Sequence, residues 1–473
     1  MMKRNAVSVT NLTFRYGQLE NLPLFSQTSF TLKQGEHVLV LAPPDSGKST
    51  LGRLMCALIP KYQEGVLDGS IVVDGRDVRT CEPWELTQSC TLVCQDPQEQ
   101  LLMTTCEDEI AFPLESLGLP RDIIVKRVRN ALHSWHLNHV AHANPQELSG
   151  GERKRLLLAV TDAIQAPVWI LDEAFDDLDA MWRGQLIQRI SESDKTILVL
   201  ASRYIDEFRG TFDTYGLLHE QKIHFAGEED IAVRFETICD ESFPSVEIDM
   251  PKGVAHTLTC TEILAEHPRK SVGDSEPFIL QASSFSLSSG ELVALVGPNG
   301  SGKSTFSRTL CGLHTTIRGF FSYDGGVVDR KTLHRLVGYV FQNPDFELFL
   351  PTVRDELDWS ARHVSCDKQT KKRMVEECAE RFHLNLTDSV ATMAYGMRKH
   401  LQGAIHYLLD RPFYILDELD SGVTYSAAFE MVALLRSRGA GILLITHDRA
   451  FAEAMAERTY TIQKGILSGG TTV

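Results

Sequence analysis

The chain carries the same phosphate-binding pattern twice, and this repeat limits its possible folds more than any other feature. The pattern G-x-x-x-x-G-K-[ST] joins a strand to a helix through a glycine-rich turn. Backbone N–H groups of the turn surround nucleotide phosphates, the lysine reaches the β- and γ-phosphates, and the hydroxyl binds Mg²⁺. The second copy is complete and predicts nucleotide contacts by Gly297, Pro298, Asn299, Gly300, Ser301, Gly302, Lys303, Ser304 and Thr305.

The first copy of the pattern is altered. It has Ala42 in place of the leading glycine, Pro44 lacks an N–H group, and Asp45 places a negative charge beside the expected phosphates. The lysine and the hydroxyl remain. The first copy is therefore predicted to hold a nucleotide without hydrolysing it, through Ser46, Gly47, Lys48, Ser49 and Thr50.

Other short motifs repeat at nearly the same spacing. Lys48 and Lys303 are 255 residues apart, the glutamines Gln95 and Gln342 are 247 apart, and the runs VWILDE and FYILDE are 245 apart. Near-constant offsets indicate two tandem homologous domains. We expect an α/β fold with domains at 1–225 and 256–473, joined by an acidic linker at 226–255 that contains two prolines.

Composition narrows the class of protein. Hydrophobic residues make up 43% and charged residues 23%, as in ordinary globular proteins, and no apolar run approaches the roughly 20 residues of a membrane helix. The N-terminus lacks the apolar stretch of a secretion signal, and the ten scattered cysteines form no C-x-x-C pair, so we expect reduced thiols. A net charge of −16 argues against a nucleic-acid partner, although a local basic patch remains compatible with it.

The order of the motifs resembles that of ATP-binding cassette (ABC) ATPases, twice over nearly the whole chain. The run LSGGE at 148–152 follows the first phosphate-binding loop, and an apolar strand ending in an Asp–Glu pair comes about twenty residues later. The resemblance implies two tandem P-loop NTPase domains. Each would have a mixed sheet core and a helical signature subdomain, and the two would pair head to tail.

The resemblance also assigns roles to single residues. Asp172 or Asp417 would hold Mg²⁺ through its water shell, and Glu173 or Glu418 would act as general base toward water. The alternative for such a pair is a helix cap beside a solvated acid. Gln95 and Gln342 would contact Mg²⁺ and the water. His447 would contact the γ-phosphate. The metal ligands of the intact site would be Ser304, Gln342 and Asp417.

Head-to-tail pairing would place each ATP between the phosphate loop of one domain and the signature of the other. The complete second loop would then meet Ser149, Gly150, Gly151 and Asp179 of the first domain. The altered first loop would meet a second-domain signature that is itself altered. Four replacements gather in that composite site: Ser202 for the histidine, Ala394 for the signature serine, Tyr395 for a glycine and Thr424 for the aspartate. This partition predicts one hydrolytic site and one degenerate site.

The aromatic residue that stacks on adenine in this family is matched by Tyr16 in the first domain. A packing role at a strand edge is the alternative for Tyr16. The second domain has His267 near that place, so the stacking partner of the intact site is left open.

The segments after the two glutamines, QDPQEQLLMTTCEDEIAF and QNPDFELFLPTVRDELDW, resemble those of energy-coupling factor (ECF) transporter ATPases. This resemblance implies import of a vitamin or a transition metal ion, at the cytoplasmic face of the membrane. The partners would be an integral membrane scaffold and a small substrate-binding membrane subunit. Five apolar residues form either a socket for a coupling helix of that scaffold or part of the core: Leu101, Leu102, Met103, Leu348 and Phe349.

Two alternatives remain for the function. A fused ATPase of a monosaccharide importer would share the degenerate site but not the ECF-like segments. A tandem-cassette translation factor would have two intact sites and a long, basic linker, whereas this linker is short and acidic.

Overall fold

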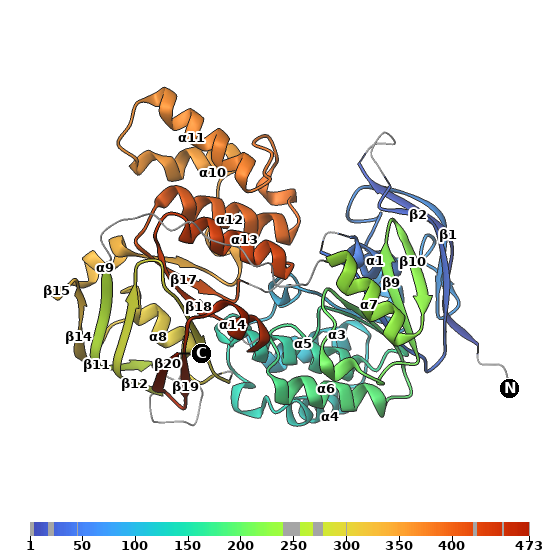
Figure 1. Ribbon diagram of the computed structural model, residues 1–473. Helices are drawn as coiled ribbons and strands as arrows, with labels where there is room; N and C mark the ends of the chain where they lie inside the picture. The colour runs from blue at the N-terminus through green and yellow to red at the C-terminus, as the bar shows by residue number, and fades with distance from the viewer. Residues whose placement is uncertain are drawn as a thin grey trace. The chain divides into compact units, whose positions relative to one another are not determined.

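The computed structural model describes residues 4–17, 23–44, 46–239, 256–267, 278–298, 300–419, 423–446 and 449–472. The described residues up to Cys239 form one compact unit, and those from His256 onward form a second, coloured from blue to green and from yellow to red in Figure 1. Each unit combines sheets with helices, which confirms the predicted α/β class.

The core of the first unit is a largely parallel sheet in the order β10-β9-β3-β8-β7-β6. Its central strands are short runs of leucine, valine and isoleucine in which almost every residue is buried, as expected when helices or a second sheet cover both faces. The strands are β3 (His37–Leu41), β6 (Cys90–Val93), β7 (Val168–Asp172), β8 (Thr196–Ala201), β9 (Thr214–His219) and β10 (Lys222–Ala226).

A second sheet of the first unit is antiparallel, in the order β2-β1-β4-β5. Buried and exposed residues alternate along β2, because one face packs on a core cluster and the other meets solvent. The strands are β1 (Asn5–Tyr16), β2 (Phe25–Lys33), β4 (Gly65–Val73) and β5 (Arg76–Asp77).

The helices of the first unit lie on the faces of the parallel sheet and in a helical subdomain. Helices α3, α4 and α5 pack against one another around a buried cluster that includes Trp135. The helices are α1 (Lys48–Met55), α2 (Pro83–Leu86), α3 (Cys106–Ser116), α4 (Arg121–Ser134), α5 (Gly150–Ile164), α6 (Ala180–Ser191) and α7 (Glu228–Cys239).

The second unit repeats this plan with its strands joined in one sheet, β15-β14-β11-β12-β20-β19-β13-β18-β17-β16. Strands β13, β18, β17 and β16 are parallel neighbours, and β12 joins them to the antiparallel part through β20. The strands are β11 (Thr257–His267), β12 (Phe278–Ser288), β13 (Leu292–Val296), β14 (Arg318–Tyr323), β15 (Gly326–Val328), β16 (Val337–Val340), β17 (Phe413–Asp417), β18 (Gly441–Ile445), β19 (Arg458–Gln463) and β20 (Ile466–Thr472).

The first six helices of the second unit follow in the same order as those of the first, but α14 lies between β18 and β19, whereas α7 follows β10. Helices α10, α11 and α12 form its helical subdomain. The helices are α8 (Lys303–Leu310), α9 (Arg330–Leu336), α10 (Val353–Ser360), α11 (Lys368–Arg381), α12 (Tyr395–Leu409), α13 (Tyr425–Arg436) and α14 (Arg449–Met455). Across the described ranges, no helix is both long and apolar enough to cross a membrane.

The predicted linker at 226–255 differs from the structure in its first part. Residues Glu228–Cys239 form α7, which packs on β9 and β10, and Ile231 and Phe235 join the core of the first unit. Three of the acidic residues that suggested a linker, Glu228, Glu229 and Asp230, lie in the first turn of this helix, where they interact favourably with its dipole. The first unit therefore extends to Cys239, and residues 240–255 lie outside the described part of the chain.

The place of α7 in the first core can be tested by truncating one side chain. Phe235 is completely buried, so Phe235→Ala should lower the free energy of unfolding of the first unit by about 3–5 kcal/mol. Val233 on the same helix is 61% exposed and provides the matched control, since Val233→Ala should change little. Urea denaturation of both variants checks this, and equal stabilities would show that α7 contributes nothing to the core.

Candidate nucleotide-binding sites

Parallel strand pairing places the motif residues of each unit at one edge of its sheet. In the second unit, β13 leads into the phosphate-binding loop, β17 ends at Asp417, and β16 leads to Gln342. Ligands of α/β proteins bind at this carboxyl edge of the strands. His447 follows β18 but lies outside the described residues.

The complete loop of the second unit has the backbone form that the pattern requires. Gly300 and Gly302 have positive φ angles of 71° and 110°, and a Cβ on Gly297 would lie 2.3 Å from the carbonyl oxygen of Ile462. Lys303 is 6% exposed, and its Nζ donates to the carbonyl oxygens of Gly297 (2.7 Å) and Pro298 (3.1 Å). The amine thus lies within the loop that would hold the phosphates. Asn299 is outside the described residues.

Asp417 is suited to hold a cation. Burial raises the pKa of this carboxyl group to about 6, because an ionised carboxylate is poorly stabilised away from water. The Tyr339 hydroxyl donates to Asp417 Oδ2 at 2.6 Å and lies 3.1 Å from the Ser307 hydroxyl. Together with Ser304 and Gln342, Asp417 offers the oxygen donors that Mg²⁺ prefers.

The structure places the side chains of Gln342 and Glu418 in contact. The side-chain amide of Gln342 donates to Glu418 Oε2. Glu418 has a φ angle of 50°, which non-glycine residues rarely adopt, and its N–H donates to the carbonyl oxygen of Ile445 at 2.8 Å. Lys399 Nζ donates to the carbonyl oxygen of Glu418 at 2.8 Å.

The altered site of the first unit contains a buried ion pair. Lys48 Nζ lies 3.1 Å from Glu173 Oε1, and both side chains are less than 8% exposed. Glu173 Oε2 also accepts from the Ser202 N–H at 3.1 Å, so the residue that replaces the histidine binds the predicted base. Burial raises the pKa of Asp172 to about 6, while a hydrogen bond with Ser49 favours its charged form.

The candidate adenine-stacking residues have different surroundings in the two units. The Tyr16 hydroxyl lies 2.9 Å from the Thr50 hydroxyl, next to the altered phosphate loop. In the second unit, His267 pairs with Phe278 across the strands, and a Cβ on Gly302 would lie 2.7 Å from Phe278 Cζ. Phe278 is therefore an aromatic ring against the intact loop, on a strand outside the motifs identified in the sequence.

The signature of the first unit begins a helix with a full capping box. The Ser149 hydroxyl oxygen accepts from the N–H of Glu152, and the Glu152 carboxylate accepts from the N–H of Ser149 at 3.1 Å. Gly150 and Gly151 form the first turn of α5. Asp179 caps α6 by accepting from the N–H of Trp182, and Thr424 caps α13 in the same way.

The altered signature of the second unit lacks this cap. Ala394 occupies the N-cap position of α12 and has no side chain able to accept a hydrogen bond. Tyr395 occupies the first helical position instead of a glycine, and its hydroxyl donates to the carbonyl oxygen of Gln342 at 3.0 Å. This contact was not foreseen from the sequence.

Two buried lysines were also missed by sequence reasoning. Lys154 on α5 and Lys399 on α12 are both fully buried. Lys154 Nζ donates to the carbonyl oxygens of Cys94 (3.3 Å) and Gln95 (2.8 Å). The two lysines are 245 residues apart, the offset of the Asp–Glu pairs, and this spacing could have identified them.

The five apolar residues after the glutamines separate into core and surface. Leu101 is 3% exposed and belongs to the core, and Leu348 packs against the core of the second unit. Leu102 and Phe349 are 71% and 69% exposed, and Met103 is half-buried.

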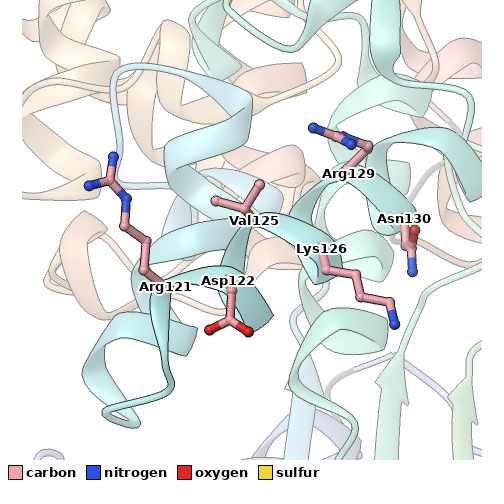
Figure 2. A pocket seen from close by; sticks show the side chains of 6 residues that line it. All are labelled: Arg121, Asp122, Val125, Lys126, Arg129 and Asn130. Carbon is pink, nitrogen blue, oxygen red and sulfur yellow. The ribbon is translucent and has the colours of Figure 1, made fainter.

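A shallow hollow of about 700 Å³ lies along α4 and is lined by none of the predicted nucleotide-binding residues (Figure 2). Three cationic side chains contribute to it, which makes this helix a local basic patch on a chain of negative net charge. The ends of Arg121 and Lys126 point away from each other, so the charges do not converge on one ligand. The lining residues are Arg121, Asp122, Val125, Lys126, Arg129 and Asn130.

Comparison with known families identifies the class of the protein. The model of the ABC transporter family matches residues 25–176 and again residues 280–421, together more than half of the chain. The chain therefore belongs to the ABC transporter family, as a tandem pair of its ATP-binding domains, and it is an ATPase. Domains of this kind bind ATP, generally with Mg²⁺, and the donor sets described above fit both.

Similar proteins match nearly the full length of the chain. The chain is 28% identical to the "Putative HMP/thiamine import ATP-binding protein YkoD" of Bacillus subtilis strain 168, over 95% of this chain and 88% of that protein. It is 27% identical to a "Putative ABC transporter ATP-binding protein" of Treponema denticola, over 99% and 96%. The solved complex of the archaeal ribosomal stalk protein aP1 with the ribosome recycling factor aABCE1 matches 97% of this chain and 90% of that one. Its TM-score is 0.58 at 18% identity, which shows the fold alone.

The different caps of α5 and α12 lead to a testable prediction. Ser149→Ala removes the cap of α5 and should destabilise its first turn by about 1 kcal/mol. Ala394→Ser should have the opposite effect on α12, because the N-cap backbone angles of Ala394 and Ser149 are nearly the same. Amide hydrogen exchange of Glu152 and Met397, without nucleotide, should be faster in the first variant and slower in the second. Unchanged exchange in both would show that the cap does not control these turns.

Proposed function

We propose that the chain is the ATP-hydrolysing subunit of a membrane importer of the ECF type, which takes up a vitamin or another micronutrient such as a transition metal ion. The ECF-like segments after Gln95 and Gln342 support this proposal. The relative from Bacillus subtilis, whose name refers to import of HMP and thiamine, supports it as well. The observation that carries it is the pair of exposed apolar turns that follow the glutamines.

These two turns are built alike. In the first unit, Glu109 is 6% exposed and its Oε2 accepts from the N–H groups of Leu102 (2.8 Å) and Met103 (2.7 Å). In the second unit, Glu356 is 2% exposed and its Oε1 accepts from the N–H groups of Phe349 and Leu350, both at 2.6 Å. Each buried carboxylate therefore fixes a turn that holds a large apolar side chain in solvent.

An apolar side chain that is already fixed in solvent can bury its surface against a partner without the cost of ordering the turn. In the proposed complex, Leu102 and Phe349 each receive a coupling helix of an integral membrane scaffold. A small substrate-binding membrane protein completes the complex, and the ATPase lies at the cytoplasmic face. Gln95 and Gln342 immediately precede these turns in the sequence, so a change at the nucleotide reaches the membrane partner over a short distance.

We further propose that only one composite site hydrolyses ATP, with the two domains paired head to tail. In that site, the second-unit loop and Lys303 hold the phosphates, and Ser304, Gln342 and Asp417 hold Mg²⁺. Glu418 accepts the proton of the attacking water. Bound Mg²⁺ would neutralise charge on the transferred phosphoryl group. First-unit Ser149, Gly150, Gly151 and Asp179 close the site, and His447 contacts the γ-phosphate.

The contacts of the altered site support its degenerate role. The Lys48–Glu173 ion pair engages the amine expected to bind phosphate and the carboxylate expected to act as base. Ser202 binds the same carboxylate through its backbone N–H, and its side chain lacks the imidazole that would contact the γ-phosphate. Lys48, Ser49 and Thr50 still allow nucleotide binding, which stabilises the paired domains as any bound ligand does.

The transport function can be tested by affinity purification of the full chain from gently solubilised native membranes, followed by mass spectrometry. Recovery of a multi-span scaffold and a small multi-span protein would support the importer, and the ligand of the small protein would identify the cargo. Recovery of a pair of sugar-permease-like proteins would show instead that the chain drives a monosaccharide importer. Recovery with ribosomes and no membrane protein would overturn transport.

The single-site proposal predicts unequal effects of two matched substitutions. Glu418→Gln should reduce ATP turnover by about a hundredfold or more, the size expected for loss of a general base, because an amide does not accept the proton of the attacking water. Glu173→Gln should leave more than half of the turnover, since its site does not hydrolyse ATP. Steady-state phosphate release from the purified complex measures both. Comparable losses in the two variants would contradict a single hydrolytic site.

If the exposed turns are the docking site, substitutions in them should weaken binding of the membrane scaffold without changing the stability of the chain. Phe349→Ala and Leu102→Ala should each reduce co-purification of the membrane scaffold severalfold, while the melting temperature stays within a few degrees, because both side chains are exposed. Val327 on β15 is 73% exposed and serves as a matched control. If Val327→Ala reduces recovery as much as Phe349→Ala, the turns are not the docking site.

A further inference from the structure

Tyr395 in the second unit is equivalent to a glycine in the first unit. The offset of 245 residues aligns it with Gly150, the first residue of α5. From the sequence alone, this tyrosine is only a departure from the signature motif of the second unit. In the structure, however, the half-buried Tyr395 side chain is directed at its own unit, and its hydroxyl donates to the carbonyl oxygen of Gln342 at 3.0 Å.

This hydrogen bond takes over the task of a lysine in the first unit. There, Lys154 Nζ donates to the carbonyl oxygen of Gln95, the counterpart of Gln342, at 2.8 Å. The corresponding Lys399 donates instead to the carbonyl oxygen of Glu418 at 2.8 Å. Its ammonium group lies 5.7 Å from the centre of the Tyr395 ring, within the range of a cation–π contact. In the second unit, therefore, Tyr395 binds the Gln342 carbonyl, and Lys399 binds the Glu418 carbonyl.

The resulting contacts converge on Glu418. Tyr395 holds the backbone of Gln342, and the side-chain amide of Gln342 donates to the Glu418 carboxylate. Lys399 holds the carbonyl of the same glutamate, with its Nζ 2.8 Å from the oxygen. Arg398 binds Asp345, three residues after Gln342, with its Nη1 2.6 Å from Asp345 Oδ2. The start of α12 therefore fixes the segment that carries Gln342.

We propose that Tyr395 is a positioning residue for ATP hydrolysis at the phosphate loop of its own unit, through Gln342 and Lys399. This inference rests on the proposed role of Glu418 as the hydrolytic base. With the Tyr395 hydroxyl on the Gln342 carbonyl, Lys399 holds the carbonyl of Glu418, whereas Lys154 holds that of Gln95 in the first unit.

The test compares Tyr395→Phe with the unsubstituted chain in the purified complex. This variant keeps the aromatic ring over Lys399 and removes only the hydroxyl. We expect kcat to fall by about threefold to tenfold, as for loss of one hydrogen bond acting in the transition state. The KM for ATP and the Kd for a fluorescent ATP analogue should stay within about twofold, because Tyr395 makes its hydrogen bond to Gln342 and not to the phosphate loop.

Three further variants make the outcome decisive. Tyr407→Phe removes a hydroxyl from the same helix, α12, and should leave kcat unchanged. Tyr395→Gly restores the family residue and should lower kcat at least as much as Tyr395→Phe. In a Gln342→Ala background, Tyr395→Phe should lose most of its effect, because the amide that it positions is absent.

The results separate this inference from the function on which it rests. If Glu418→Gln abolishes turnover but Tyr395→Phe and Tyr395→Gly retain the full kcat, Tyr395 is only an altered signature residue and the inference fails. If Glu418→Gln retains turnover, the hydrolytic role of Glu418 fails first. A loss of ATP affinity equal to the loss of kcat would also overturn a positioning role.

Discussion

The hydrogen-bonded pairing of parallel strands is the constraint on which both candidate sites depend. In the second unit, Asp417 pairs with Ile445 at the end of β17 and β18, and the Glu418 N–H continues the ladder to the Ile445 carbonyl. In the first unit, Asp172 pairs with Leu200, and the Glu173 N–H donates to the Leu200 carbonyl. Register therefore determines where each carboxylate stands relative to the phosphate loop, and it holds both glutamates at positive φ.

On this shared frame, a few side chains make the two sites chemically different. Lys48 is held in a buried ion pair with Glu173, whereas Glu418 contacts Gln342 and Lys399. The Tyr339 hydroxyl binds the aspartate of the second unit. Its counterpart in the first unit is Leu92, which lies against Gly52. Because the strand pairing beside the two Asp–Glu pairs is the same, these differences reflect local replacement of side chains.

Much of this arrangement could be predicted from the sequence because it depends on short motifs. The loops, the Asp–Glu pairs and the glutamines lie in short runs whose chemistry determines their residue types, and their near-constant offsets revealed the duplication. The linker was harder to place. Acidic composition suggested a connector at 226–255, but Ile231 and Phe235 have helical spacing and find a core surface on β9 and β10. Burial against a distant strand is not visible in local composition.

The sequence by itself determined the class of protein, the doubled nucleotide-binding machinery and the candidate residues, because phosphate and Mg²⁺ binding accept few residue types at few spacings. Tertiary structure decided which residues are buried and which of them contact one another. It showed that Leu101 is core while Leu102 is surface, that Glu109 and Glu356 brace equivalent turns, and that Tyr395 reaches Gln342. Such contacts join segments that are far apart in the chain, and only the packing of helices on the sheet brings them within hydrogen-bonding distance.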